Sequence, residues 1–329
     1  MPEISVIIPT HNRWSLLQRT LAGALGQEGV DLEVVVVDDG SSDGTSERLE
    51  ALGEPRLRVF RNETPLRVAG ARNVGLENAR GEWLAYLDDD DVWAPDKLSR
   101  QLRAAKAADA PFVYTSSALV DPELNVLAAQ AAPDPAGILE ENLSYCAIPG
   151  GCSNVIARAE LFRSTGGFDT DLVVGEDWDM WIRLLLACDG KAASCDEYLY
   201  GYIQHASSSI IKNRGLVSLD YERIEERYAE ARRERGVEVD NVALRRWLAG
   251  NHRRAGDRWG AAKIYLKSAW RDRNLGNVAR AAALPLGEST IRRFSPREAP
   301  VLESAESWLP LYRPGGRLES VSAAGADPA

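Results

Sequence analysis

Short apolar runs alternate with helical stretches along the first hundred residues. Two runs, at residues 4–8 and 33–37, have the length and continuity of buried parallel strands, and two further strands are indicated at 57–60 and 83–87. The helical stretches follow them at 16–25, up to about 52, 69–79 and 97–108. This alternation predicts an α/β fold, with a parallel sheet, right-handed crossovers and helices on both faces.

The pattern changes in the rest of the chain. Residues 112–116, 155–156 and 198–205 indicate further strands, and the prolines of 121–142 indicate a hairpin or a mobile insertion. Four helical stretches follow, at 217–235, 242–255, 259–271 and 275–284. We therefore expect three parts: an α/β domain over 1–212 with halves 1–110 and 111–212, a helical module over 213–300, and a largely disordered tail over 301–329.

Composition narrows the class of protein. A net charge of −10 over 329 residues argues against nucleic acid as the partner, although not against nucleotides. Four cysteines form no C-x-x-C pair and only three histidines are present, which makes a structural zinc site unlikely and predicts reduced thiols. We see neither a signal peptide nor an apolar run of about 20 residues, so we expect a cytoplasmic protein.

Acidic residues gather where the predicted strands end. Asp88, Asp89, Asp90 and Asp91 follow the strand that ends at Leu87, and four adjacent carboxylates repel one another unless a cation lies among them. A hard divalent ion such as Mg²⁺ or Mn²⁺ suits these oxygens, and a solvated acidic turn is the alternative.

Two other strand ends carry polar residues that belong to the same edge of the sheet. They are Thr10–Arg13 and the pair Asp38 and Asp39. Because ligands bind at the carboxyl ends of parallel strands, this edge predicts a nucleotide crevice. Neither a G-x-G-x-x-G fingerprint nor a P-loop is present.

Four segments in order, SVIIPTHNR, VVVVDDGSSDGT, GARNVGL and YLDDDD, resemble the successive signatures of family 2 glycosyltransferases. The resemblance covers residues 4 to about 210. It implies a GT-A fold, which is a Rossmann-like mixed sheet with helices on both faces, here followed by a C-terminal α-helical module. It also implies a nucleotide-sugar donor, with a UDP-sugar favoured.

The resemblance assigns the nucleotide and the metal to particular residues. The nucleotide site would comprise Pro9, Thr10, His11, Arg13, Asp38, Asp39, Arg72, Asp88 and Asp89. A capped turn is the alternative for Asp38 and Asp39, and a helix-surface arginine is the alternative for Arg72. The Mn²⁺ or Mg²⁺ ligands would be Asp90 with Asp88, joined by His205, for which a structural or exposed role is equally open.

The acceptor side lies in the second half of the resemblance. The turn at 149–154 resembles a glycine-rich acceptor segment and implicates Gly151 and Ser153. GEDWDMWIRL resembles the segment that carries the catalytic base, which makes Asp177 the base of an inverting transfer and Glu176 its neighbour. For these two acids, complementing the helix dipole is the alternative. Trp178 is expected in the core more than on a sugar ring.

The acceptor itself stays open between a carbohydrate, a glycolipid and a small molecule. Arginines make the C-terminal part basic, which would suit peripheral contact with an anionic membrane; a solvated helix face or a homo-oligomer contact is the plainer interpretation. Two other hypotheses for the whole protein are a nucleotidyltransferase and a catalytically silent scaffold. The loop PTHNR lacks the glycine-rich signature of the former.

Overall fold

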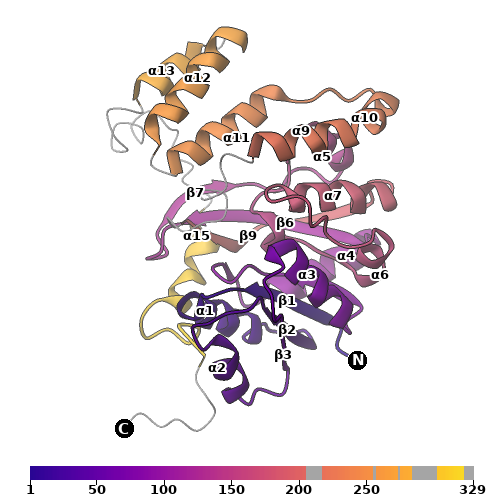
Figure 1. The fold of residues 1–329 in the computed structure, drawn as a ribbon, viewed down its shortest axis with the longest axis vertical. Helices are drawn as coiled ribbons and strands as arrows, with labels where there is room; N and C mark the ends of the chain where they lie inside the picture. Colours follow the sequence, from indigo (N-terminus) through magenta and orange to yellow (C-terminus); the bar gives the residue numbers. More distant parts are fainter. Residues whose placement is uncertain (205–216, 255–256, 273–274, 284–301, 322–329) are drawn as a thin grey trace.

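The computed structural model describes residues 1–204, 217–254, 257–272, 275–283 and 302–321. Within them, one mixed sheet of nine strands organises the molecule, in the order β3-β2-β1-β4-β8-β6-β9-β5, with β7 paired to β6. The strands are β1 Ile4–Thr10, β2 Leu32–Asp38, β3 Leu57–Arg61, β4 Trp83–Tyr86, β5 Val92–Trp93, β6 Phe112–Val120, β7 Val126–Gln130, β8 Ile156–Arg158 and β9 Ala192–Ile203. Helices cover both faces (Figure 1).

The first four strands form the predicted parallel half. β1 pairs in parallel with β2 and β4, and β2 pairs in parallel with β3. The connecting helices are α1 Trp14–Leu25, α2 Thr45–Ala51, α3 Arg67–Asn78 and, after β4, α4 Lys97–Ala108. Parallel pairing brings the carboxyl ends of β1, β2 and β4 to one edge, as the sequence predicted.

Alternating side chains of the strands supply two separate cores. Ile4, Val6 and Ile8 face α1 and α4, whereas Ile7 faces α3 on the other side of the sheet. This is the two-residue period of a strand. Both faces are apolar, which explains why the central strands are continuous apolar runs.

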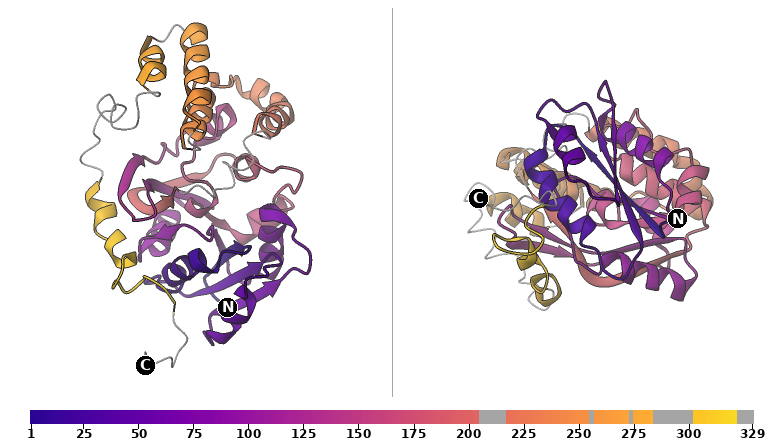
Figure 2. Two further views of the ribbon diagram at one scale, coloured as in Figure 1. Left: turned by 60° about the vertical axis from the view of Figure 1, so that its left-hand side comes forward. Right: turned by 90° about the horizontal axis from the view of Figure 1, so that it is seen from below.

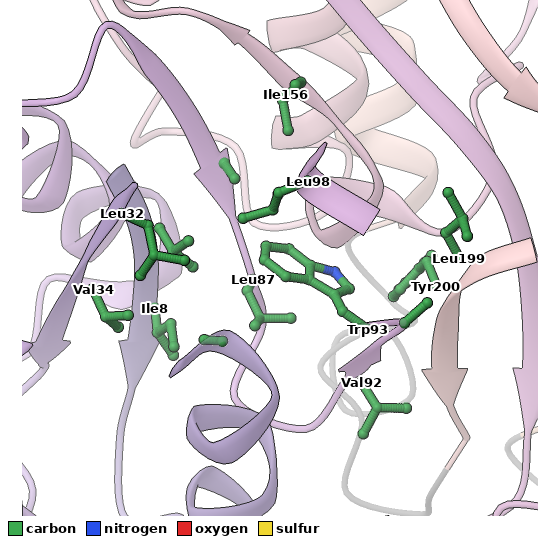
Figure 3. Close-up of a cluster of buried hydrophobic side chains, with 14 of the residues drawn as sticks. Ile8, Leu32, Val34, Leu87, Val92, Trp93, Leu98, Ile156, Leu199 and Tyr200 are labelled. Carbon is green, nitrogen blue, oxygen red and sulfur yellow. The ribbon is translucent and has the colours of Figure 1, made fainter. Parts of the chain in front are cut away.

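The acceptor half continues the same sheet with antiparallel pairing at β8, which pairs with both β4 and β6. The expected hairpin within 121–142 is β6–β7, and the same stretch continues into a helix. The helices of this half are α5 Ile138–Ser144, η1 Gly151–Asn154 (a 3-10 turn), α6 Ala159–Ser164 and α7 Glu176–Ala187. The two-residue strand β5 was not predicted. It places Trp93 among Leu87, Leu98 and Leu199 (Figure 3).

The C-terminal helices begin with α9 Val217–Arg227 and α10 Ala229–Arg235, which are separated at Tyr228 where one helix was predicted. The others are α11 Asn241–Arg254, α12 Arg258–Asp272 and α13 Leu275–Ala283. In Figure 1, α12 and α13 lie at the end of the molecule opposite α2.

The expectation of a largely disordered tail is wrong for residues 302–321. This segment contains α15 Leu302–Glu306 and the 3-10 turn η3 Leu309–Tyr312, and it runs back beside α1 (Figures 1 and 2). Trp308, Leu309 and Tyr312 are each at most 4% exposed and join the α1 side of the core. Composition pointed to disorder because these few large apolar residues are diluted by Gly, Ser and Pro.

Candidate active site

The edge formed by β1, β2 and β4 gathers the acidic turn and the loop after β1. The hydroxyl of Thr10 donates to Asp89 Oδ2 at 2.7 Å, and the backbone N–H of Asp39 donates to the carbonyl of Thr10 at 2.8 Å. Residues from three separate parts of the sequence therefore meet there, as the strand ends predicted.

The acidic turn is not a simple solvated turn, because its side chains alternate in burial. Asp88 and Asp90 are 31% and 14% exposed, whereas Asp89 is only 6% exposed. Arg13 donates to Asp89 at 2.9 Å and to Asp90 at 2.8 Å. Burial, reinforced by Asp90 and opposed by Arg13, raises the pKa of Asp89 to about 7. Arg13 is therefore one of the cations expected among these four carboxylates.

Arg72 supplies the rest and joins the two halves of the site. Its guanidinium donates to Asp88 at 2.6 Å and to Glu176 at 2.8 Å, and it lies over the ring of Phe168. The Arg72 side chain is 4% exposed, so these contacts lie in a largely water-excluded place where ion pairs are strong. Arg72 therefore lies in the site rather than on a helix surface.

Asp177 and Glu176 open helix α7 after Gly175, whose backbone is left-handed at φ +86°. A Cβ on Gly151 would lie 3.1 Å from Asp177 Oδ2, so the glycine-rich turn passes directly over this carboxylate. Burial raises the pKa of Asp177, against the effect of Arg72, and raises that of Glu176 to about 7. A carboxylate with a raised pKa is suited to accept a proton near neutral pH.

No specific role was predicted for Asp91 from the sequence. In the structure Asp91 links the acidic turn to the acceptor half through hydrogen bonds. Asp91 is fully buried; Ser153 donates to its Oδ2 at 2.7 Å, and the Tyr200 hydroxyl lies 2.7 Å from the same oxygen. Ser153 also accepts the backbone N–H of Asp88 at 3.0 Å. Ser153 is itself fully buried, so it positions Asp88 instead of meeting an acceptor directly. Only the buried position of Tyr200 on β9, which a sequence does not show, would have revealed this network.

The residues expected at the base and ribose differ in how much surface they offer. Pro9 and Asp38 are buried, and Asp38 accepts from Ser41 N–H, the Ser46 hydroxyl and Arg61, which is the capped-turn alternative. Asp39 is 5% exposed and its Oδ1 accepts from Asn62 and the backbone N–H of Leu66. The exposed His11 hydrogen bonds the Asp39 carbonyl through Nδ1. Their contacts with a nucleotide stay a prediction.

Trp178 lies in the core, as the sequence favoured, and the alternative of a contact with the acceptor is wrong. It is 1% exposed, and its indole N–H donates to the carbonyl of Asn142 at 2.7 Å. A sugar ring stacks only on an exposed aromatic face, so Trp178 belongs to the core between α5, α7 and α9.

Only two of the three expected metal ligands, Asp88 and Asp90, belong to the part of the chain that the structure describes. His205 lies outside the described residues, and among those that are described no group of three or more His, Cys, Asp or Glu is arranged to hold an ion. Asp88 and Asp90 remain as two hard carboxylates. Mg²⁺ usually takes one or two carboxylates together with substrate phosphates and water, so the donor set fits such an ion.

Comparison with known proteins places this arrangement. The fold resembles that of the mannosyltransferase PcManGT from Pyrobaculum calidifontis, solved with GDP-Man and Mn²⁺, with a TM-score of 0.55 and 21% identity over 93% of this chain and 86% of that one. It also resembles S. aureus TarS 1–349 in complex with UDP-GlcNAc, with a TM-score of 0.53 and 18% identity over 81% and 72% of the two chains. The fold is therefore that of a GT-A glycosyltransferase.

Sequence similarity gives the family. Residues 5–148 match the model of glycosyl transferase family 2. The succinoglycan biosynthesis protein ExoO of Rhizobium meliloti is 32% identical over 67% of this chain and 65% of its own length. The Escherichia coli UDP-Glc:α-D-GlcNAc-diphosphoundecaprenol β-1,3-glucosyltransferase WfgD is 27% identical over 64% of this chain and 80% of its own length. Residues 5–148 therefore form a family 2 glycosyltransferase domain, and the chain spans just under two thirds of the Rhizobium relative.

Proposed function

We propose that this chain transfers a sugar from a nucleotide-sugar donor to an acceptor hydroxyl, with inversion at the anomeric carbon. The observation that carries the proposal is the double contact of Arg72, which joins Asp88 of the acidic turn to Glu176 beside Asp177. Residues about 90 positions apart thus lie together, which supports one site with a side for a diphosphate and a side for a proton acceptor.

The donor side would use the residues after β1, β2 and β4, within the half 1–110. Arg13 and Arg72 are the cations that face the acidic turn, and an incoming diphosphate would share them with Asp90 and Asp88. UDP is the favoured nucleotide, since WfgD is named for UDP-Glc and TarS was solved with UDP-GlcNAc; PcManGT, solved with GDP-Man, keeps GDP as the alternative.

Asp88 and Asp90 would hold Mn²⁺ or Mg²⁺, in keeping with the Mn²⁺ of PcManGT. When bound, the ion supplies Lewis-acid stabilisation of the departing nucleoside diphosphate. Arg13 forms an ion pair with Asp90 Oδ2 at 2.8 Å, so metal affinity should depend on how readily this pair is broken.

The acceptor side lies within 111–212, around Gly151 and Asp177. Asp177 would take the proton from the acceptor hydroxyl as its oxygen attacks the anomeric carbon. Glu176 would hold Arg72 in place. A cytoplasmic setting stays part of the proposal.

The test is a thermal-shift panel of UDP, GDP, dTDP and CDP, each with and without Mn²⁺, on the wild type, Asp90→Asn and Asp31→Asn. A ligand at about 100 times its Kd adds about 2.7 kcal/mol to the free energy of unfolding. We expect UDP with Mn²⁺ to stabilise the wild type and the control Asp31→Asn, which lies at the opposite end of β2, but not Asp90→Asn.

Donor turnover completes the test. UDP release from UDP-sugars should require Asp90, and the anomeric configuration of any transferred sugar should be inverted. A retained configuration would remove Asp177 as the base. No shift with any nucleotide, together with no release of nucleotide, would leave the scaffold hypothesis in its place.

A further inference from the structure

The outer face of α12 exposes three large apolar side chains. Trp259, Leu266 and Trp270 are 69%, 51% and 84% exposed. At about 100° per residue, positions 7 and 11 residues after Trp259 return to within about 20° of it, so the three side chains form one stripe along the helix. Single exposed apolar residues are common, but two largely exposed tryptophans aligned on one helix are not explained by chance exposure.

The opposite side of α12 is a packed interior. Ala261 and Ala262 are buried with Ala281 of α13, and Ser268 is hydrogen bonded by Asn277 at 3.1 Å. The orientation of the helix is therefore fixed by its neighbours. By its helical positions the stripe lies on another side of α12 than these contacts. Helices α12 and α13 form one end of the molecule (Figure 1).

Two lysines flank the stripe. At about 100° per residue, Lys263 and Lys267 follow Trp259 by about 40° and 80° around the helix, and both are exposed, as are Arg258 on α12 and Arg280 on α13. Among the side chains of these two helices that the structure describes, no exposed one is acidic. The chain as a whole carries a net charge of −10, so this basic and aromatic face stands apart from the rest of the protein.

We propose that the α12 face defined by Trp259, Lys263, Leu266, Lys267 and Trp270 docks on an anionic lipid bilayer. Indole rings favour the boundary between headgroups and acyl chains, because they combine an apolar body with a polar N–H. Lysines beside them gain from the negative surface potential. The structure thus points to one face of α12, whose lysines are separate from the arginines that make the C-terminal part basic, and adds the apolar anchors.

The charges also favour a lipid surface over a second copy of the chain as the partner of this face. In a symmetric dimer the same patch meets itself, which would bring the cations of two copies together around the tryptophans. A lipid surface supplies the opposite charge and an apolar layer at once. The inference does not depend on the transfer reaction, and binding is measured without any donor.

The experiment is cosedimentation of the full chain with vesicles of phosphatidylcholine alone and with 30% phosphatidylglycerol (about a third of the lipid, enough to set the surface charge). We expect binding to the anionic vesicles and little to the neutral ones, with affinity falling as salt is raised. Lys263→Glu/Lys267→Glu and Trp259→Ala/Trp270→Ala should each lower the partition coefficient at least tenfold. Lys106→Glu and Leu127→Ala, exposed on other elements, are the matched controls and should bind as the wild type does.

All variants should keep the wild-type circular dichroism and melting midpoint, because the replaced side chains are exposed. Equal binding by the wild type and the two α12 variants, or no binding to anionic vesicles, would overturn the proposal. A wild-type dimer in ultracentrifugation that Trp259→Ala/Trp270→Ala converts to a monomer, without vesicle binding, would assign the face to a second copy instead. If only Lys263→Glu/Lys267→Glu lost binding, the tryptophans would not contact the bilayer, and the proposal would equally be contradicted.

Discussion

Asp177 is the residue on which the proposed chemistry turns. Replacing it by Asn removes the proton acceptor while keeping its shape, so we expect kcat to fall about 10²- to 10⁴-fold with little change in donor KM. Asp171→Asn, an exposed acid in the preceding loop, is the matched control. A variant that retains more than a tenth of wild-type kcat would show that Asp177 is not the base.

The raised pKa values in this site set the pH dependence of transfer. A base must be ionised to accept a proton, and burial raises the pKa of both Asp177 and Glu176, the latter to about 7. We expect kcat/KM to fall as pH drops through neutrality, well above the range of an ordinary carboxyl group near pH 4. A profile that is flat down to pH 5 would contradict this environment. The carboxyls titrate together, so the profile reports the pair.

Lys97 is another buried ionisable residue, and its burial lowers the free energy of unfolding. It is fully buried, its Nζ donates to Gln101 at 2.7 Å, and it lies 4.2 Å from the centre of the Trp93 ring. Burial lowers the pKa of Lys97 well below its usual value. The unfolded chain keeps this proton up to about pH 10.4, so it binds more protons than the folded one, and lowering the pH below that value reduces stability. We expect Lys97→Met to raise the melting midpoint, more at pH 7 than at pH 10, whereas exposed Lys106→Met should not.

At the scale of elements, helix α9 holds the loop that leads to the base. Asp220 Oδ2 accepts the backbone N–H groups of Val173 at 2.9 Å and Val174 at 3.0 Å, two and one residues before the turn at Gly175. Asp220 is 2% exposed, so these charge-assisted hydrogen bonds are shielded from water. A helix outside the sheet thereby fixes the start of α7.

Asp220→Ala should therefore reduce kcat several-fold without changing donor KM, and should destabilise the fold by about 2 kcal/mol. Asp220→Asn keeps an oxygen acceptor and should restore most of the kcat, which a general loss of stability would not explain. The matched control is Glu222→Ala, which removes an exposed acid from the same helix. Equal kcat in all three variants would show that α9 does not position the base.

The elements were largely predictable from the sequence, and their pairing was less so. The apolar runs of β1, β2 and β4 are buried on both faces, which leaves a continuous signal, whereas β3 at the edge of the sheet is only half-buried. β5 has two residues, and its position depends on pairing with β9 more than a hundred residues later, which no local pattern encodes. The motifs located the acidic turn and Asp177. The alternation of burial along that turn, the ion pair of Arg72 with Glu176 and the hydrogen bonds of Asp91 follow only from packing in three dimensions.

At the scale of the whole molecule, the C-terminal segment 302–321 packs against α1, β5 and β9. The Tyr312 hydroxyl donates to the carbonyl of Trp93 at 2.6 Å, and Trp308 donates to the carbonyl of Tyr198 at 2.9 Å. A Cβ on Gly23 of α1 would overlap the Tyr312 ring, so the glycine makes room for this contact.

The helices that the structure describes include none with the length and apolar character of a membrane span.

The contact between Gly23 and Tyr312 predicts that Gly23→Ala changes stability in opposite directions with and without the Tyr312 ring. Tyr312→Ala should destabilise the protein by about 3–5 kcal/mol, as deletion of a buried aromatic ring does, while Leu127→Ala at an exposed site should change stability by less than about 0.5 kcal/mol. Gly23→Ala in the wild type should also destabilise, by about 1–3 kcal/mol, because the new methyl group meets the ring.

In the Tyr312→Ala background the same substitution meets no ring and should stabilise α1 by up to about 1 kcal/mol, the helix propensity difference between glycine and alanine. A double-mutant cycle in urea measures the difference between the two backgrounds. Because the two residues are 289 positions apart in sequence, only a docked C-terminal segment produces such a coupling. If Gly23→Ala has the same effect in both backgrounds, the segment does not lie on α1 in solution.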